Sequence, residues 1–229
     1  MATDHPVIAV LGGTGALGQG LARRWAGAGY SLILGSRSSE RAAAAAGEMR
    51  AGATASVEGC GNAEAAVGAD IIVLAVPYAG RDEILEAVRE GARGKVFVDA
   101  TVPLLPPVAR VSLPPEGAAG RATQEILGDD VKVVSALQNV AADHLTDPDH
   151  HIDCDVLVCG NDRGACERVI ELVEALGLRG WHAGRIENAA AAEALTSVLI
   201  FINRRYGIDG AGLRITGAHG DRDAGGANA

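Results

Sequence analysis

Short apolar runs recur along the first two thirds of the chain, and segments with helical spacing of apolar residues separate several of them. The runs predict β-strands over residues 7–11, 31–35, 69–76, 95–99, 131–136 and 155–159. The spacing between them predicts helices over about 16–28, 38–51 and 80–93. Continuous apolar strands that alternate with helices are typical of a parallel sheet buried on both faces. The pattern therefore predicts an α/β fold with a doubly wound parallel sheet.

The pattern changes after residue 162. An amphipathic helix is predicted over 163–175, a short strand over 178–183 and a second helix over 186–206. The polar, glycine-rich residues 217–229 predict a disordered tail. The last helix has one apolar stripe, formed by Leu195, Val198, Leu199 and Ile202.

A glycine-rich turn follows the first predicted strand and opens the first helix, with the sequence Gly12-Gly13-Thr14-Gly15-Ala16-Leu17-Gly18. In such a unit Gly13 allows a tight turn, Gly15 lets the backbone approach a pyrophosphate, and Gly18 lets the helix pack closely. The helix N-terminus then favours the anion. A glycine pattern is weak evidence in a chain with 31 glycines, but here a strand and a helix flank it. Residues 13–18 are therefore predicted to bind a dinucleotide in a Rossmann-type domain.

The end of the second predicted strand distinguishes between the two nicotinamide cofactors. Leu32-Ile33-Leu34 runs into Gly35-Ser36-Arg37, and no carboxylate follows the strand. NAD-binding domains usually place Asp or Glu there, which would repel a 2′-phosphate. Arg37 can instead bind that phosphate bidentately, with Ser36 as a donor and Arg41 one helical turn further on. We therefore expect NADP(H), in preference to the reading of Arg37 as a merely solvated arginine.

Ligands of open α/β sheets bind outside the carboxyl ends of the strands. At these ends we expect Val76, Pro77, Thr101 and Asn139 to contact the cofactor as well. An overlapping set of residues is predicted to position a ring: Pro77, Tyr78, Gln138, Asn139 and Val140. None of them is expected to be an essential acid or base. The proline-rich residues 104–120 predict an irregular surface excursion.

The bulk composition favours an enzyme that acts on small molecules. The net charge is -9 with a pI near 5.1 and there is no Lys/Arg block, so no nucleic-acid partner is expected. The uninterrupted apolar runs are shorter than a bilayer span, and residues 1–6 do not resemble a signal peptide. We therefore expect a cytoplasmic protein with no membrane partner.

The cysteines and the histidine-rich segment suggest no metal centre. Cys60, Cys154, Cys159 and Cys166 are irregularly spaced and are expected to be free thiols. Residues 149–155 contain His, Asp and Cys side chains without a recognised ligand spacing, so a solvated loop is expected there instead of a metal site.

The two lysines, Lys95 and Lys132, each begin an apolar run. Hydroxyacid and sugar-acid dehydrogenases need a positioned lysine as acid/base, so this class is nearly excluded. Imine and pyrroline carboxylate reductases stay open, although only about fifty residues remain for their long helical dimerisation domain. A non-catalytic NADPH sensor is an open alternative of another class, because binding residues alone do not establish turnover.

Several segments together are typical of one family. They are residues 12–18, Gly35-Ser36-Arg37, Ala75-Val76-Pro77-Tyr78, 133–137, 155–162 and Glu193-Ala194-Leu195-Thr196. The chain resembles the NADPH-dependent reductases of the deazaflavin coenzyme F420 up to about Thr216. The resemblance implies that Thr14, Ser36, Arg37 and Arg41 hold NADPH, and that Pro77, Val140 and the C-terminal helix border the deazaflavin ring.

One departure from this family concerns the hydride acceptor. The loop after Ser135-Ala136-Leu137 commonly begins with His-Thr in the family, and here it begins with Gln138-Asn139. The cytosolic NADPH domain of flavin-reducing metalloreductases is similar over residues 158–162 and has a glutamine in a comparable loop. The expected reaction is thus hydride transfer between NADPH and a flat heteroaromatic acceptor. Coenzyme F420 is favoured, and flavin (FMN, FAD) or ferric-flavin reduction is the alternative.

The resemblance also suggests how the chain is organised. We expect an NADP-binding domain over residues 5–162 and a small C-terminal α/β portion over 163–216 that completes the acceptor site. A homodimer is implied, with the apolar helix over 187–206 as the candidate interface, although its stripe is also consistent with internal core.

Overall fold

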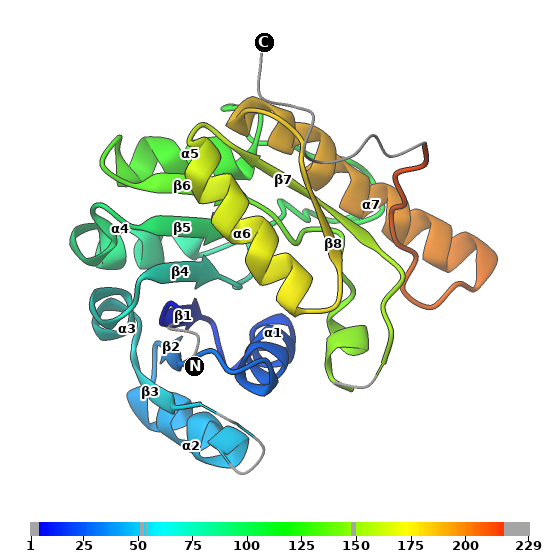
Figure 1. The fold of residues 1–229 in the computed structure, drawn as a ribbon. Helices are drawn as coiled ribbons and strands as arrows, with labels where there is room; N and C mark the ends of the chain where they lie inside the picture. Colours follow the sequence, from blue (N-terminus) through cyan, green and yellow to red (C-terminus); the bar gives the residue numbers. More distant parts are fainter. Residues whose placement is uncertain (1–4, 51–52, 54, 148–149, 218–229) are drawn as a thin grey trace.

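The computed structural model describes residues 5–50, 53, 55–147 and 150–217. Within them eight strands form one sheet in the order β3-β2-β1-β4-β5-β6-β7-β8 (Figure 1). Strands β1 to β6 are parallel, β7 runs antiparallel to β6, and β8 is parallel to β7. The predicted doubly wound α/β sheet is confirmed. The strands are β1 Ile8–Leu11, β2 Leu32–Ser36, β3 Val57–Gly61, β4 Ile71–Leu74, β5 Val96–Asp99, β6 Lys132–Ser135, β7 Asp155–Gly160 and β8 Arg179–His182.

Helices cover both faces of the sheet. The α-helices are α1 Ala16–Gly27, α2 Ser39–Arg50, α3 Asn62–Gly68, α4 Arg81–Ala92, α5 Ala119–Leu127, α6 Arg163–Ala175 and α7 Ala189–Tyr206. Two short 3-10 helices span Ala142–Leu145 and Ile186–Asn188.

Strands β1 and β4 are apolar throughout because their side chains point alternately into two cores. Ile8 and Val10 of β1 pack on one face with buried residues of α1, α2 and α6, including Leu21, Met49 and Leu172. Ala9 and Leu11 pack on the other face with residues of α3, α4 and α5, including Ala65, Leu85 and Leu127. This alternation is the physical reason for the continuous hydrophobic runs in the sequence.

The sequence did not indicate β3, α3 or α5. In β3 only Val57 is buried and two of its five residues are glycine, so this edge strand lacks an apolar run. The irregular excursion predicted to end at Gly120 ends earlier, because α5 begins at Ala119. A Cβ on Gly120 would lie 2.9 Å from the Ser135 Cβ. The glycine that suggested a loop therefore lets α5 pack closely on β6.

The residues after 162 extend the same sheet. Helix α6 and strand β8 follow β7, and residues near 213 return to it, with Asp155 N donating to the Leu213 carbonyl at 2.7 Å. The predicted domain boundary at 162 falls between β7 and α6 and stays a division made from sequence. The predicted tail over 217–229 lies outside the described residues except for Gly217.

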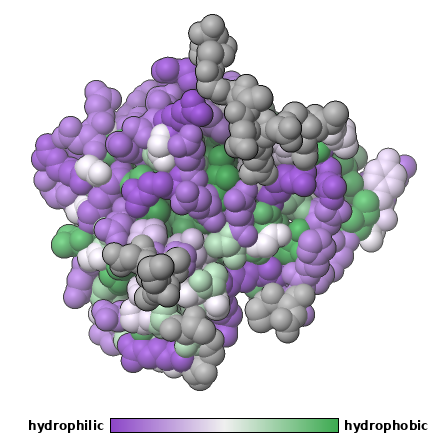
Figure 2. Space-filling model, viewed as in Figure 1, coloured by the Kyte–Doolittle hydropathy of each residue, from purple (hydrophilic) through white to green (hydrophobic). Residues whose placement is uncertain are grey.

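One segment of the described chain, 186–206, has the length and apolar composition of a membrane span. Core helices of water-soluble proteins can have the same length and apolar composition. Glu193 of this segment is buried and accepts the backbone N–H groups of Ala119 and Gly120 at the start of α5. One side of α7 is therefore packed against the protein. Figure 2 shows a largely hydrophilic molecular surface on the viewed face, with scattered apolar areas.

Candidate functional site

The turn between β1 and α1 is built around Gly12. Its φ is +83°, and a Cβ there would lie 2.6 Å from the Ala75 carbonyl oxygen. The left-handed backbone conformation thus falls on Gly12, whereas the sequence assigned the tight turn to Gly13. Gly18 packs directly against the Gly12 carbonyl, which confirms the close helix contact expected of it. Gly15, the N-cap residue of α1, is exposed and leaves the turn open to a ligand.

The N-terminus of α1 is suited to an anion. The first turn of this helix contains no acidic residue, and no side chain in the described part of the chain caps it. The positive end of the helix dipole and the first backbone N–H groups therefore stay available for a phosphate.

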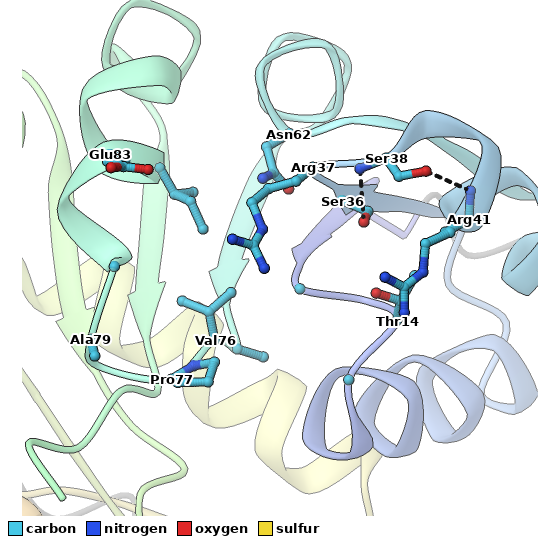
Figure 3. A pocket seen from close by; sticks show the side chains of 15 residues that line it. Thr14, Ser36, Arg37, Ser38, Arg41, Asn62, Val76, Pro77, Ala79 and Glu83 are labelled. Carbon is cyan, nitrogen blue, oxygen red and sulfur yellow. Dashed lines mark hydrogen bonds between the residues drawn. The ribbon is translucent and has the colours of Figure 1, made fainter. Parts of the chain in front are cut away.

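A cavity of about 670 Å³ lies at the carboxyl ends of β1, β2 and β4 (Figure 3). It contains seven of the predicted site residues: Thr14, Gly15, Ser36, Arg37, Arg41, Val76 and Pro77. Its other lining residues were not predicted: Gly12, Ser38, Asn62, Ala75, Ala79, Gly80, Glu83 and Ile84.

One wall of the cavity is basic. Arg37 and Arg41 are exposed, and neither has a carboxylate partner among the residues that the structure describes. Figure 3 shows the Arg37 guanidinium pointing into the cavity and Arg41 reaching towards Thr14. Ser38 orders this corner, because its backbone N–H donates to Ser36 Oγ and its Oγ accepts from Arg41 N, both at 3.3 Å. Two uncompensated guanidiniums here fit a 2′-phosphate.

The nearest acid on α2, Glu40, bonds to Ser38 and forms no salt bridge with either arginine in the described part of the chain. Ser38 Oγ donates to Glu40 Oε2 at 2.8 Å, and backbone and Ser38 hydrogen bonds lower the pKa of the Glu40 carboxyl. Its charge is therefore bound at the N-terminus of α2, where the helix dipole favours it.

Sequence reasoning missed Asn62 because it missed the strand that positions it. Asn62 begins α3 directly after β3, and its Oδ1 is buried without a hydrogen-bond partner among the described residues. Its place in the cavity wall makes it a candidate acceptor for a polar group of the cofactor. Asn62 could have been found from the sequence only by first recognising the edge strand β3, because the residue follows directly after it.

The remaining predicted residues do not line this cavity. They are Gly13, Ala16, Leu17, Gly18, Tyr78, Thr101, Gln138, Asn139 and Val140. The first four shape the turn and α1 beneath the cavity. Tyr78 adjoins Pro77 at its edge, and the last four lie at the ends of β5 and β6.

Tyr78 is half-buried and stacked against a cation. The Arg81 guanidinium carbon lies 4.3 Å from the centre of the Tyr78 ring. Burial raises the pKa of the Tyr78 hydroxyl, and the charge of Arg81 offsets part of that shift. The phenol therefore stays protonated at neutral pH. Arg81 is itself buried and donates to the Ala119 carbonyl at 2.9 Å and to Thr123 Oγ1 at 3.0 Å.

The amides of the β6–β7 loop have different roles. Asn139 Nδ2 donates to the Asp155 carbonyl at 2.8 Å and contacts Cys154 Sγ at 3.1 Å, so its donor is used inside the protein. Gln138 Nε2 donates to the Asp99 carbonyl at 2.8 Å and to Ser135 Oγ at 2.7 Å.

Both lysines lie at the amino ends of their strands. Lys95 Nζ donates to the Ala66 and Val67 carbonyls, and Lys132 Nζ pairs with Asp162 at 3.1 Å. Neither lysine lies at the carboxyl edge of the sheet, where the cavity is. This placement agrees with the exclusion of lysine-dependent dehydrogenases.

The four cysteines are free, as expected. Burial raises the pKa of Cys159 and of Cys166 to about 11, which disfavours reactive thiolates. Among the described residues no three His, Cys, Asp or Glu side chains come together to hold a metal ion. Residue 149 of the histidine-rich segment lies outside that description.

Comparisons with known proteins agree with this geometry. Residues 7–103 match the family described as NADP oxidoreductase coenzyme F420-dependent. The chain is 38% identical to the F420-dependent NADP reductase of Methanocaldococcus jannaschii over 219 residues, which cover 91% of this chain and 97% of that protein. The chain belongs to the F420-dependent NADP reductase family. The corresponding reductase of Methanothermobacter thermautotrophicus is 39% identical over 91% of this chain and 94% of its own.

Solved structures support the fold of this reductase family. The structure of a candidate F420-dependent NADP reductase from Arthrobacter superposes with a TM-score of 0.75 at 28% identity, covering 93% of this chain and 100% of that one. An imine reductase from Myxococcus stipitatus shares the fold only, with a TM-score of 0.60, 22% identity and 62% of its own length covered. The expectation of an NADPH-dependent oxidoreductase of the F420 reductase type is thus confirmed at the level of the family.

Proposed function

We propose that the protein transfers a hydride between NADPH and a flat heteroaromatic acceptor, the deazaflavin coenzyme F420. The observation that carries the proposal is the cavity that joins the glycine turn to Arg37 and Arg41. Its two ends fit the pyrophosphate and the 2′-phosphate of one cofactor, and the 38% identical relative is named for both substrates. Stopped-flow absorbance with NADPH and oxidised F420 tests the activity, and no reduction of F420 at saturating NADPH would contradict it.

The residues of this chain supply binding and orientation. NADPH, when bound, supplies the hydride. The turn at Thr14 and Gly15 with the α1 N-terminus holds the pyrophosphate, while Ser36, Arg37 and Arg41 hold the 2′-phosphate. Val76 and Pro77 then direct the nicotinamide towards the ends of β5 and β6. Two stacked rings held in a water-poor slot need proximity more than side-chain acid or base.

Flavin or ferric-flavin reduction is the second candidate, favoured by Gln138 at a position where the family commonly has histidine. A neutral amide cannot become cationic near pH 7, so it interacts with a ring edge only by hydrogen bonds. Parallel assays with FMN and FAD distinguish the candidates by the ratio of kcat/KM values. A non-catalytic NADPH sensor would bind the cofactor and reduce none of these acceptors.

Tyr78 is expected to act as a wall for the acceptor ring and not as an acid. Tyr78→Phe keeps the stacked ring on Arg81 and should leave hydride transfer within about tenfold, whereas Tyr78→Ala should raise the acceptor KM through lost stacking area. A positioned general acid contributes about 10²–10⁴-fold. Single-turnover kinetics measure the difference, and a loss of about a thousandfold in Tyr78→Phe would overturn this role.

We further propose a homodimer formed through the outer face of α7. Val198 is 42% exposed, Phe201 54% and Tyr206 70%, which is unusual for apolar side chains on one helix. Sedimentation velocity should give about twice 23.3 kDa for the wild type and the monomer mass for Phe201→Glu. Val67→Glu, at an apolar residue of α3 that is 67% exposed, should leave the dimer intact. A monomeric wild type would contradict the proposal.

A further inference from the structure

Two buried polar atoms at the ends of β5 and β6 have no hydrogen-bond partner among the described residues. They are Thr101 Oγ1 and Gln138 Oε1, on residues that are 1% and 6% exposed. Buried polar groups are nearly always paired, because an unpaired one has lost its water without compensation. Two such atoms at adjacent strand ends therefore require an explanation.

Asp99 fixes both residues in place. Its Oδ1 accepts the Thr101 backbone N–H at 2.8 Å, and its carbonyl accepts Gln138 Nε2 at 2.8 Å. The opposite orientation of the Gln138 amide would place its oxygen against the Asp99 carbonyl, where two acceptors repel. The amide nitrogen is thus held inward, and Oε1 is the atom left without a donor.

Asp99 cannot turn to satisfy Thr101 Oγ1. Its other carboxylate oxygen accepts Thr123 Oγ1 at 2.6 Å and lies 3.5 Å from Arg81 Nη1. Asp99 is fully buried, and its partners come from α4 and α5. The pair of free atoms is therefore a rigid feature of the strand ends.

These strand ends lie next to the cofactor cavity. Strand β4, whose end leads to Val76 and Pro77 in the cavity wall, pairs with β5, and β5 pairs with β6. A cofactor bound in the cavity with its nicotinamide directed along the sheet edge brings a ring to Thr101 and Gln138. This placement rests on the proposed function.

We propose that Thr101 and Gln138 recognise the amide edge of the ring bound at this place. Gln138 Oε1 accepts an amide N–H of the ligand, and Thr101 Oγ1 donates to the neighbouring carbonyl oxygen. The carboxamide of nicotinamide and the lactam edge of a deazaflavin or flavin both carry this donor and acceptor. The two rings present the same donor and acceptor. Loss of the contact would raise the NADPH Kd if the ring is nicotinamide and the acceptor KM if it is a deazaflavin or flavin.

Helix α7 contacts the loop that carries Gln138. Thr196 Oγ1 of α7 donates to the Gln138 carbonyl at 2.9 Å. Both free atoms are closed off from solvent, so a ligand reaches them only when the residues that cover them move.

The test compares the same substitution at two buried threonines. Thr101→Val removes an unpaired hydroxyl, so the melting temperature of the ligand-free protein should stay unchanged or rise. Thr123→Val removes a hydroxyl that bonds to Asp99 and Arg81, so it should lower the melting temperature. Thr101→Val should also weaken ligand binding about tenfold, because the ligand carbonyl loses its donor.

Two binding measurements locate the ligand edge. A tenfold rise in the NADPH Kd, measured by fluorescence titration, assigns the pair to the nicotinamide. A tenfold rise in the acceptor KM at unchanged NADPH Kd assigns it to the acceptor. Gln138→Met should affect the same constant as Thr101→Val, and a response in the other constant would contradict a shared recognition pair.

The proposal is overturned if Thr101→Val leaves both constants within twofold. It is also overturned if Thr101→Val lowers the melting temperature as Thr123→Val does, because its hydroxyl would then be bonded, for instance to a buried water. A wild type that binds NADPH but reduces neither F420 nor a flavin contradicts the proposed function instead, and the NADPH titration then decides this inference.

Discussion

Replacing Arg37 with alanine is expected to raise the KM for NADPH about ten- to a hundredfold and to leave the KM for NADH nearly unchanged. The guanidinium points into the cavity, and none of the described carboxylates pairs with it. A charge-assisted phosphate contact of this kind contributes roughly 1.5–3 kcal/mol. Because Arg37 is exposed, the effect should shrink as ionic strength rises.

A matched control separates the local contact from general electrostatics. Arg23 is also exposed, and it lies on α1 outside the lining of the cavity. Arg23→Ala removes the same charge and should leave both KM values unchanged within about twofold. Equal KM values for NADPH and NADH in the wild type would contradict the assignment of Ser36, Arg37 and Arg41 to the 2′-phosphate.

Glu193 is expected to make the fold less stable as the pH rises towards neutrality. Burial raises the pKa of the Glu193 carboxyl to about 7, although the N–H groups of Ala119 and Gly120 and the charge of Arg81 oppose that shift. In the unfolded chain the same carboxyl has a pKa of about 4.3. Between these two values the unfolded chain releases its proton first, so the free energy of unfolding falls as pH rises.

The size of this effect follows from the separation of the two pKa values. It amounts to on the order of 3 kcal/mol between about pH 4 and pH 7, and it stays constant above that range. Urea titrations of the wild type and of Glu193→Gln measure it, because the neutral amide removes the proton exchange. Glu187→Gln, at an exposed position next to the start of α7, should retain the wild-type pH dependence. Parallel curves for the wild type and Glu193→Gln would contradict the prediction.

The strands that are buried on both faces could be predicted from the sequence. Strands such as β1 and β4 are covered on both faces, so every residue in them is apolar and the run is unmistakable. The edge strand β3 faces no such demand and was missed, and Asn62 was missed with it. The antiparallel turn of β7 against β6 was also not predicted, because an apolar run carries no information about strand direction.

The cavity is lined by more of the residues predicted for the phosphates than of those predicted for the rings. The turn requires glycine because of its backbone geometry, and a phosphate requires arginine because of its charge. Both requirements can be recognised from residue type and position in the sequence. The roles of Gln138 and Asn139 depend on which acceptors face their amide groups after folding. Asn139 donates a hydrogen bond to the Asp155 carbonyl, whereas Gln138 Oε1 has no partner among the described residues, and no sequence pattern distinguishes these outcomes.

The most direct test of the account is a single turnover of the wild type with NADPH that carries deuterium at both C4 positions of the nicotinamide, mixed with oxidised F420. The account predicts that F420 is reduced with a primary kinetic isotope effect for the transferred C4 position and that the deuterium is recovered in the reduced deazaflavin. Reduction without transfer of the label, or no reduction of F420 while NADPH is bound, would contradict direct hydride transfer between the two rings.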